Sequence, residues 1–125
     1  MKIVQKHWGY EEWLELNSSY CFKRIFIKSG CRTSLQYHMK KLETNCIVSG
    51  KALVLLERED GTIEETEMTQ NSIITVLPGR KHRITAITDI LMYEVSTPEV
   101  DDVIRLADDN NRPNGFIAYE HSHKI

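Results

Sequence analysis

The sequence lacks the features that mark several classes of protein. It has only three cysteines and no C-x-x-C pair, which indicates neither a disulfide framework nor a cysteine-based zinc site. No apolar run approaches the roughly 20 residues of a membrane-spanning helix. The N-terminal residues also lack the apolar core of a signal peptide. These absences predict a cytoplasmic protein with reduced thiols and no membrane partner.

An excess of charge of one sign is also missing. The 16 basic residues are offset by 18 acidic ones and do not cluster, so nothing indicates a nucleic-acid partner. At 125 residues, 41% of them hydrophobic, the chain is long enough to bury a core. It contains no linker, repeat or low-complexity segment. We therefore expect a single domain over residues 1–125, with a loosely attached tail from about residue 113.

The sequence does contain a series of short runs rich in β-branched and aromatic residues, separated by turn residues. Such runs, regularly spaced, predict an all-β antiparallel sandwich or barrel. The segment 99–107 differs, because acidic residues crowd its start and apolar residues follow at helical spacing, which predicts a short C-terminal helix. The expected strands cover residues 20–28, 33–38, 43–49, 51–57, 62–68, 72–77, 82–87 and 90–96.

Four side chains could form a metal site. Gln36 and His38 share one face of their strand because side chains alternate. If this strand pairs with the next one through the turn at residues 39–42, Glu43 converges on both. His82 begins a later strand after a Pro-Gly turn and supplies a fourth donor. We therefore expect Gln36, His38, Glu43 and His82 to bind one metal ion.

This donor set indicates the kind of metal and chemistry. Two imidazole nitrogens and two oxygens with one negative charge suit Zn²⁺ first, with Mn²⁺, Co²⁺, Ni²⁺ or Fe²⁺ as alternatives. The amide oxygen of Gln36 is neutral and leaves the cation electron-poor. An electron-poor cation favours polarising a substrate carbonyl over activating O₂, so the pattern favours an isomerase over a dioxygenase.

The same residues resemble the two metal motifs of the cupin superfamily. The first motif reads G-x5-H-x-H-x4-E-x6-G, and it runs here from Gly30 to Gly50 with Gln36 at its first histidine position. The second, G-x5-P-x-G-x2-H, is similar to the stretch from Asn71 to His82. Asn71 replaces a glycine, and asparagine is the non-glycine residue that adopts positive φ most readily.

A closer resemblance is to the cupin domain of type II mannose-6-phosphate isomerases. The match follows the chain in order from Trp8 to Arg112, and its most specific part is the Ser-Leu-Gln-Tyr-His string. The matching stretches are Lys6-His7-Trp8-Gly9, Lys23-Arg24-Ile25, Ser34-Leu35-Gln36-Tyr37-His38, Val48-Ser49-Gly50-Lys51-Ala52, Leu77-Pro78-Gly79-Arg80-Lys81-His82-Arg83 and Asp101-Asp102-Val103-Ile104-Arg105.

The resemblance implies a cupin double-stranded β-helix, that is, a jelly-roll barrel. It also implies a metal-dependent aldose–ketose isomerase that acts on a sugar phosphate through an enediolate, and a homodimer. Between residues 39 and 45 the chain departs from the family, with Met39, Lys40 and Lys41 in place of further histidines and an arginine. Two alternatives therefore stay open. One is an epimerase, ketoisomerase or lyase acting on another phosphorylated or nucleotide-linked sugar, and the other is a non-catalytic sugar-binding cupin.

Three cations are candidates for binding a substrate phosphate. Arg24 shares a strand face with two phenylalanines that we expect to look inward, where an anion must compensate its charge. That anion is either the substrate, which would make Arg24 catalytic, or a carboxylate such as Glu94. Lys41 lies at a turn, where it is either solvated or at the mouth of the site. Arg83 points away from His82 by strand alternation but belongs to the family string.

Overall fold

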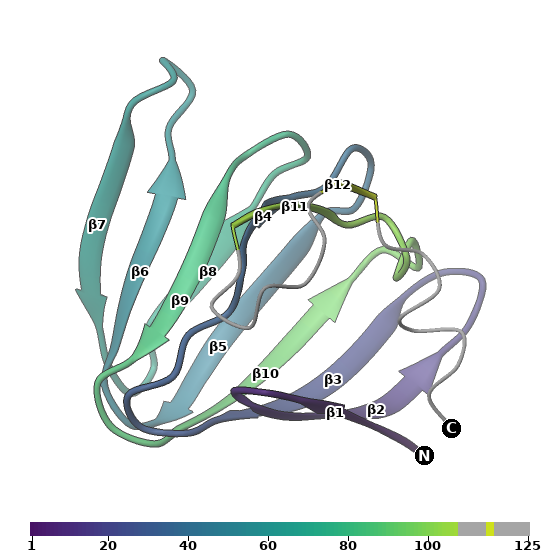
Figure 1. The fold of residues 1–125 in the computed structure, drawn as a ribbon. Helices are drawn as coiled ribbons and strands as arrows, with labels where there is room; N and C mark the ends of the chain where they lie inside the picture. The colour runs from purple at the N-terminus through teal and green to yellow at the C-terminus, as the bar shows by residue number, and fades with distance from the viewer. Residues whose placement is uncertain (108–114, 117–125) are drawn as a thin grey trace.

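The computed structural model describes residues 1–107 and 115–116, which form twelve β-strands and no helix. Two six-stranded sheets, each antiparallel, face one another (Figure 1). In spatial order, sheet A consists of β1 (Lys2–Lys6), β2 (Gly9–Leu16), β3 (Cys21–Ile27), β10 (Ile90–Ser96), β5 (Glu43–Ser49) and β8 (Ile73–Val76). Sheet B consists of β12 (Gly115–Phe116), β11 (Ile104–Ala107), β4 (Leu35–Tyr37), β9 (His82–Ala86), β6 (Ala52–Glu57) and β7 (Ile63–Met68). No helix among the described residues is long and apolar enough to cross a membrane.

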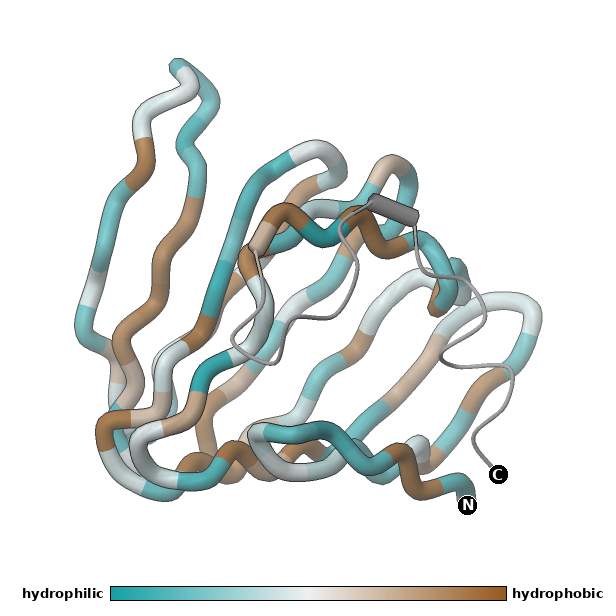
Figure 2. Tube along the Cα trace, viewed as in Figure 1, coloured by the Kyte–Doolittle hydropathy of each residue, from teal (hydrophilic) through white to brown (hydrophobic). Residues whose placement is uncertain are grey.

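The eight strands expected between residues 20 and 96 are all present. In most of them, buried and more exposed side chains alternate, as in β3, where every second residue from Cys21 to Ile27 is buried. The same alternation is visible as changes of hydropathy along the chain (Figure 2). The all-β class predicted from the spacing of apolar runs is therefore confirmed.

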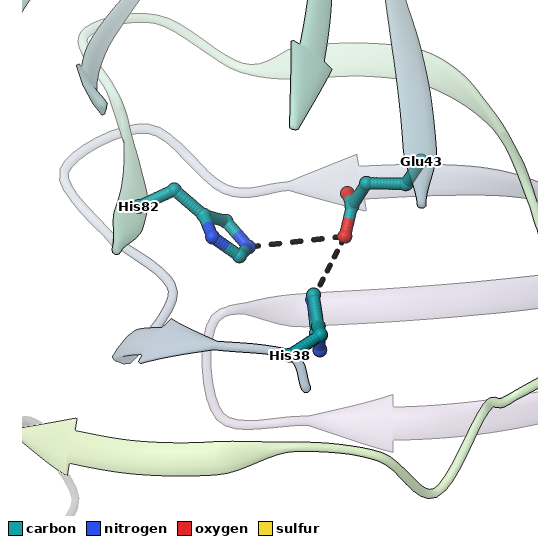
Figure 3. A group of neighbouring side chains, drawn as sticks. All are labelled: His38, Glu43 and His82. Atoms are coloured by element: carbon teal, nitrogen blue, oxygen red, sulfur yellow. Dashed lines mark ion pairs between the residues drawn. The ribbon is translucent and has the colours of Figure 1, made fainter. Parts of the chain in front are cut away.

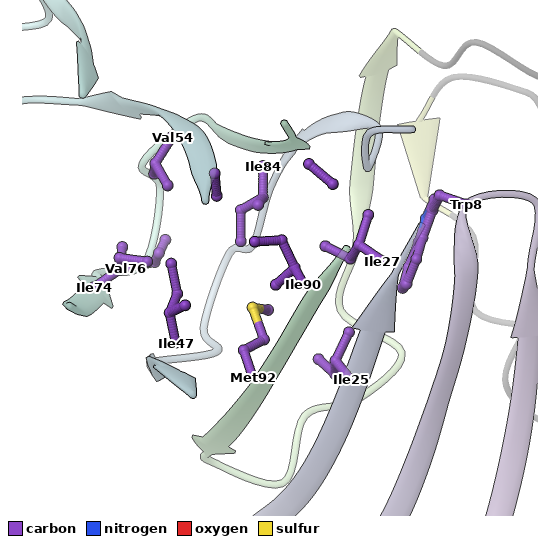
Figure 4. Close-up of a cluster of buried hydrophobic side chains, with 12 residues drawn as sticks. Trp8, Ile25, Ile27, Ile47, Val54, Ile74, Val76, Ile84, Ile90 and Met92 are labelled. Atoms are coloured by element: carbon purple, nitrogen blue, oxygen red, sulfur yellow. The ribbon is translucent and has the colours of Figure 1, made fainter. Parts of the chain in front are cut away.

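The hydrophobic core lies between the two sheets (Figure 4). Sheet A contributes mainly isoleucines, while sheet B contributes smaller residues such as Ala52 and Val54. Burying one of the larger side chains stabilises the folded protein by about 1.5–3 kcal/mol. The core fills only part of the space between the sheets, and the remainder is lined by polar and charged residues. The buried apolar cluster comprises Trp8, Ile25, Ile27, Ile47, Ala52, Val54, Ile74, Val76, Ile84, Ala86, Ile90 and Met92.

The first sixteen residues form a β-hairpin that the sequence did not predict. Strands β1 and β2 pair antiparallel, and β2 continues the sheet beside β3. Charged residues are interspersed along this stretch and mask its alternation. Nevertheless Val4, Glu11 and Trp13 point inward and are buried. The hairpin thus closes one side of the interior.

The connection at residues 39–42 does not make the hairpin expected from the sequence. Strand β4 pairs with β9 and β11 in sheet B, whereas β5 pairs with β10 and β8 in sheet A. The chain therefore crosses from one sheet to the other between His38 and Glu43. These two residues meet across the interior instead of along one sheet.

The prediction of a helix over residues 99–107 is also wrong. The segment makes a turn and then forms β11, which pairs with β4. An isolated helix of about two turns is marginal in water, whereas β4 offers an open edge whose backbone groups need partners. The strand register places Arg105 opposite Gln36. Of the tail expected from residue 113, Gly115–Phe116 pairs with β11, and the other residues lie outside those that the structure describes.

Candidate metal centre

Three of the four expected metal ligands come together between the sheets (Figure 3). His38 follows β4, His82 begins β9, and Glu43 begins β5 on the opposite sheet. Their potential ligand atoms all lie within 4.8 Å of one another. The Nε2 atom of His38 is 2.8 Å from Glu43 Oε1, and the Nε2 atom of His82 is 3.8 Å from the same oxygen. All three side chains are buried.

Backbone carbonyls fix the orientation of both imidazoles. His38 Nδ1 lies 2.6 Å from the carbonyl oxygen of Asp102, and His82 Nδ1 lies 3.0 Å from that of Arg80. A carbonyl oxygen only accepts, so each Nδ1 donates its proton there. Each Nε2 therefore faces Glu43, and in a neutral imidazole it would direct a lone pair there. Outer partners of this kind orient metal-binding histidines in proteins.

The charge states of these groups suit a cation. Burial lowers the pKa of His82 and favours its neutral form. Burial, the largest single cause, would raise the pKa of Glu43, but Lys41, His38 and His82 together outweigh it and hold that pKa well below its ordinary value. His38 Nε2 and His82 Nε2 both face Glu43 Oε1, at 2.8 and 3.8 Å. Neutral imidazoles would direct two lone pairs at this oxygen, an arrangement that a cation held between the three groups stabilises, so the residues fit a divalent metal.

Gln36, the fourth expected ligand, lies beside this group. Its backbone pairs with that of His82, and its side chain lines the same cavity. The amide oxygen accepts a hydrogen bond of 2.7 Å from the Ser34 hydroxyl. A carbonyl-type oxygen has a second lone pair, so Gln36 as a ligand stays a prediction.

The cavity between the sheets measures about 70 Å³ and extends from the candidate ligands toward the N-terminal hairpin. A chain of buried ion pairs follows it. Lys41 Nζ lies 3.0 Å from Glu94 and 3.7 Å from Glu43, and Lys23 Nζ lies 3.2 Å from Glu11 and 3.9 Å from Glu94. Acidic and basic groups thus alternate from Glu11 to the candidate metal ligands.

Lys41 is not solvated, although it lies near a turn. Only 4% of it is exposed. Burial alone would lower its pKa, but Glu94 and Glu43 outweigh it and raise the pKa, so Lys41 is charged. The turn itself is held by Asp102, whose carboxylate accepts hydrogen bonds from the backbone N–H groups of residues 39, 40 and 41. This anchoring turns the Lys41 side chain into the cavity.

The expected inward orientation of Arg24 is wrong. In β3 the odd-numbered residues are buried, so Phe22, Arg24 and Phe26 lie on the outer face. There Arg24 makes two hydrogen bonds, of 2.7 and 3.0 Å, to Glu12. The inward cation of this strand is Lys23, and Glu94, considered as a partner of Arg24, pairs with lysines instead.

Arg83 points away from His82, as alternation predicted. Its guanidinium donates to the carbonyl oxygens of Thr33 at 2.9 Å and Ala107 at 3.3 Å. Arg83 therefore joins β9 to neighbouring segments of sheet B. It does not line the cavity around the candidate ligands.

Several of the charged residues that line the cavity were not predicted from the sequence. Glu11, Lys23 and Arg105 are buried and line it, together with Glu94. One signal was available, because each of these residues alternates in step with apolar neighbours. Lys23 lies on the same face of β3 as Ile25 and Ile27. The structure was needed to show that this face points inward.

Two facing six-stranded sheets with a His, a Glu and a His directed between them define this chain as a cupin. A family model described as Mannose-6-phosphate isomerase C-terminal matches residues 1–108. The chain belongs to this family, as the sequence motifs had indicated.

Comparison with individual proteins gives the same class. A mannose-1-phosphate guanylyltransferase of Salmonella muenchen is 30% identical over an alignment of 107 residues that covers 82% of this chain and 22% of that protein. The chain thus spans about a fifth of the length of this relative.

Two solved structures share the fold at low sequence identity. The capsular polysaccharide assembling protein CapF of Staphylococcus aureus has a TM-score of 0.71 at 17% identity, over 85% of this chain and 34% of its own. An oxalate decarboxylase of Bacillus subtilis, described with Mn(II) centres, has a TM-score of 0.71 at 14% identity, over 85% of this chain and 30% of its own.

Proposed function

We propose that this chain is a metal-dependent enzyme that interconverts an aldose and a ketose phosphate, as a mannose-6-phosphate isomerase does. One observation carries the proposal. The Nε2 atoms of two buried imidazoles, both oriented by backbone carbonyls, face one buried carboxylate oxygen. His38, Glu43 and His82 would hold the metal, with Gln36 as a fourth ligand. Membership of the mannose-6-phosphate isomerase C-terminal family supports a sugar phosphate as the substrate.

The charges in the cavity support an anionic substrate. Of the buried residues that line it, three are carboxylates and three are cations: Glu11, Glu43 and Glu94 with Lys23, Lys41 and Arg105. These charges are matched, so a divalent metal adds two uncompensated positive charges. A buried excess of charge is costly unless a counter-charge enters. A phosphorylated sugar supplies such a charge.

The residues of the chain have distinct tasks in this reaction. A bound divalent metal supplies Lewis-acid polarisation of the substrate oxygens. Glu94 lines the cavity without belonging to the candidate ligands, and we assign to it the transfer of the proton between the two substrate carbons. Burial, followed by the charge of Glu43, raises the pKa of Glu94 against the opposing effect of the lysines. A raised pKa suits a carboxylate that takes and returns a proton near neutral pH.

The test combines turnover and metal content. Purified protein should interconvert mannose 6-phosphate and fructose 6-phosphate, lose this activity in EDTA and regain it with Zn²⁺ or Mn²⁺. Elemental analysis should find about one equivalent of metal per chain, and Gln36→Ala and His82→Ala should each weaken metal binding at least about tenfold. Arg83→Ala, which changes a cation outside the cavity, is the matched control and should keep its metal. Metal-free protein with full turnover would refute the proposal.

The departures between residues 39 and 45 favour a second candidate. There Lys41 and Asn45 are both buried beside Glu43, and Asn45 donates a hydrogen bond of 2.9 Å to it. These side chains alter the pocket in which a substrate must fit. One equivalent of metal without turnover of that sugar pair would therefore favour an epimerase, ketoisomerase or lyase for another phosphorylated or nucleotide-linked sugar. Sugar binding without metal would favour a non-catalytic sugar-binding cupin.

A further inference from the structure

We propose that Lys41 is a built-in counter-cation of the metal centre. It balances the charge of Glu43 when the centre holds no metal, and it lowers the affinity of the centre for divalent cations. This inference rests on the metal-binding part of the proposed function and is independent of the reaction catalysed.

The position of Lys41 makes its charge obligatory for the metal-free protein. A buried ammonium needs carboxylate partners, and Lys41 has two, Glu94 at 3.0 Å and Glu43 at 3.7 Å. Lys41 is buried, and the turn that carries it is held by three backbone hydrogen bonds to Asp102. Lys41 therefore stays beside Glu43.

A metal would compete with Lys41 for one atom. The Glu43 oxygen nearest to Lys41 is Oε1, and it is also the oxygen that both imidazole nitrogens face. A dication held there has a positive charge as its close neighbour in a poorly solvated interior, where like charges repel strongly. Lys41 lies closer to Glu94 than to Glu43 and keeps that partner when the metal binds. The affinity is thus lowered but not abolished.

Lys23 provides a matched comparison. It is as deeply buried as Lys41 and also contacts Glu94, at 3.9 Å, but its nearer partner is Glu11. Removing the charge of Lys23 perturbs the same chain of buried ion pairs, but at a position farther from the candidate metal ligands. An effect caused by general loss of buried charge would appear equally in both variants. An effect specific to the metal centre appears only at Lys41.

The experiment is calorimetric titration of chelator-treated protein with Zn²⁺ and with Mn²⁺. Lys41→Met should bind each metal at least about tenfold more tightly than the wild type, while Lys23→Met should stay within about threefold. Thermal melts without metal should show Lys41→Met as less stable, since Glu43 then loses its counter-charge. Unchanged or weaker metal binding by Lys41→Met, or an equal gain in Lys23→Met, would overturn the inference.

A second variant keeps the test valid if Lys41→Met does not fold. The double variant Lys41→Met with Glu94→Gln removes both charges of one ion pair, and it is compared with Glu94→Gln alone. The same gain of about tenfold is expected, and its absence counts against the role of Lys41. Failure of the wild type and all variants to bind metal would refute the metal centre itself. Metal binding by the wild type without the gain would refute only the inference about Lys41.

Discussion

At the scale of single residues, the site consists of a few side chains whose protonation is set by their neighbours. The Nε2 atoms of His38 and His82 face Glu43 because their other nitrogens donate to carbonyls. Lys41, His38 and His82 together lower the pKa of Glu43 despite its burial. The candidate ligands are therefore oriented by their surroundings.

Glu94 gives a prediction about turnover. Glu94→Gln keeps the size of the side chain but cannot take up a proton, so turnover should fall by a factor of about 10²–10⁴. Metal content should remain near that of the wild type, since Glu94 is not among the candidate ligands. The rate of a coupled isomerase assay, read together with elemental analysis, checks both parts. Full turnover in the variant would remove Glu94 from the reaction.

At the scale of elements, the decisive one is the crossing between the sheets at residues 39–42. It begins at His38 and ends at Glu43, so its conformation sets the distance between two candidate ligands. Asp102, in the turn before β11, holds this crossing through hydrogen bonds from the backbone N–H groups of residues 39–41. The segment that we expected to be a helix thus positions two of the candidate metal ligands.

Replacing Asp102 tests this anchoring. Burial alone would raise the pKa of Asp102, but the backbone hydrogen bonds outweigh it and lower the pKa. Asp102→Ala should lower the free energy of unfolding by about 1–2 kcal/mol at pH 7. The wild type has this contribution above pH of about 4 and loses it as the pH falls through the lowered pKa, so the difference should shrink in acid. Urea unfolding at several pH values measures it.

A control variant shows whether any loss of metal binding is specific to the crossing at residues 39–42 or follows from weakening any turn. Asp60 also accepts hydrogen bonds in a turn, from Thr62. This turn joins β6 to β7 and does not belong to the crossing. Asp102→Ala should weaken metal binding, and Asp60→Ala should leave it unchanged. Equal metal affinity in all three proteins would show that the crossing does not depend on Asp102.

The two glycines that bracket the first motif give a second prediction at this scale. Both have positive φ, at 83° for Gly30 and 96° for Gly50. A Cβ on Gly50 would lie 2.0 Å from the carbonyl oxygen of Asp89, whereas nothing lies within 4 Å of one on Gly30. Gly50→Ala should therefore destabilise the protein by about 3 kcal/mol or more, and Gly30→Ala by about 1 kcal/mol. Similar losses in the two thermal melts would contradict this difference.

At the scale of the whole molecule, the two sheets have unequal edges. Strand β7 carries Glu64, Glu65 and Glu67, and charged edges resist pairing with another chain. Strand β8 (Ile73–Val76) carries no charge. The homodimer expected from the sequence stays a prediction, and this difference favours β8 as the edge that pairs. Light scattering of the purified protein measures the mass of the particle in solution, which should correspond to two chains.

Metal binding should also stabilise the molecule as a whole, because the candidate ligands come from both sheets. A ligand present at 100 times its dissociation constant adds about 2.7 kcal/mol to the free energy of unfolding. We expect EDTA to lower the midpoint of thermal unfolding and Zn²⁺ to restore it. His82→Ala should show neither change, and a midpoint independent of metal in the wild type would argue against a site that joins the sheets.

Much of the fold could be predicted because it depends on local patterns. Runs of β-branched residues between turns gave eight strands, and the spacing of Gln36, His38, Glu43 and His82 indicated one metal group. The positive φ expected for Asn71 is present, at 71°. The N-terminal hairpin was missed because its charged residues hide the alternation. The C-terminal strand was missed because its short apolar pattern fits a helix equally well.

The sequence by itself determined the class of fold and the residues that could bind a metal, since side-chain period and donor chemistry are properties of the chain alone. Only the tertiary structure decided that β4 and β5 lie in opposite sheets, that Arg24 faces outward, and that Lys23, Lys41 and Glu94 share the cavity with the candidate metal ligands. The physical reason is that strand pairing and the choice of inner face depend on contacts between segments far apart in the chain. In β3, an error of one residue in assigning the inner face places Arg24 in the interior, where the structure has Lys23.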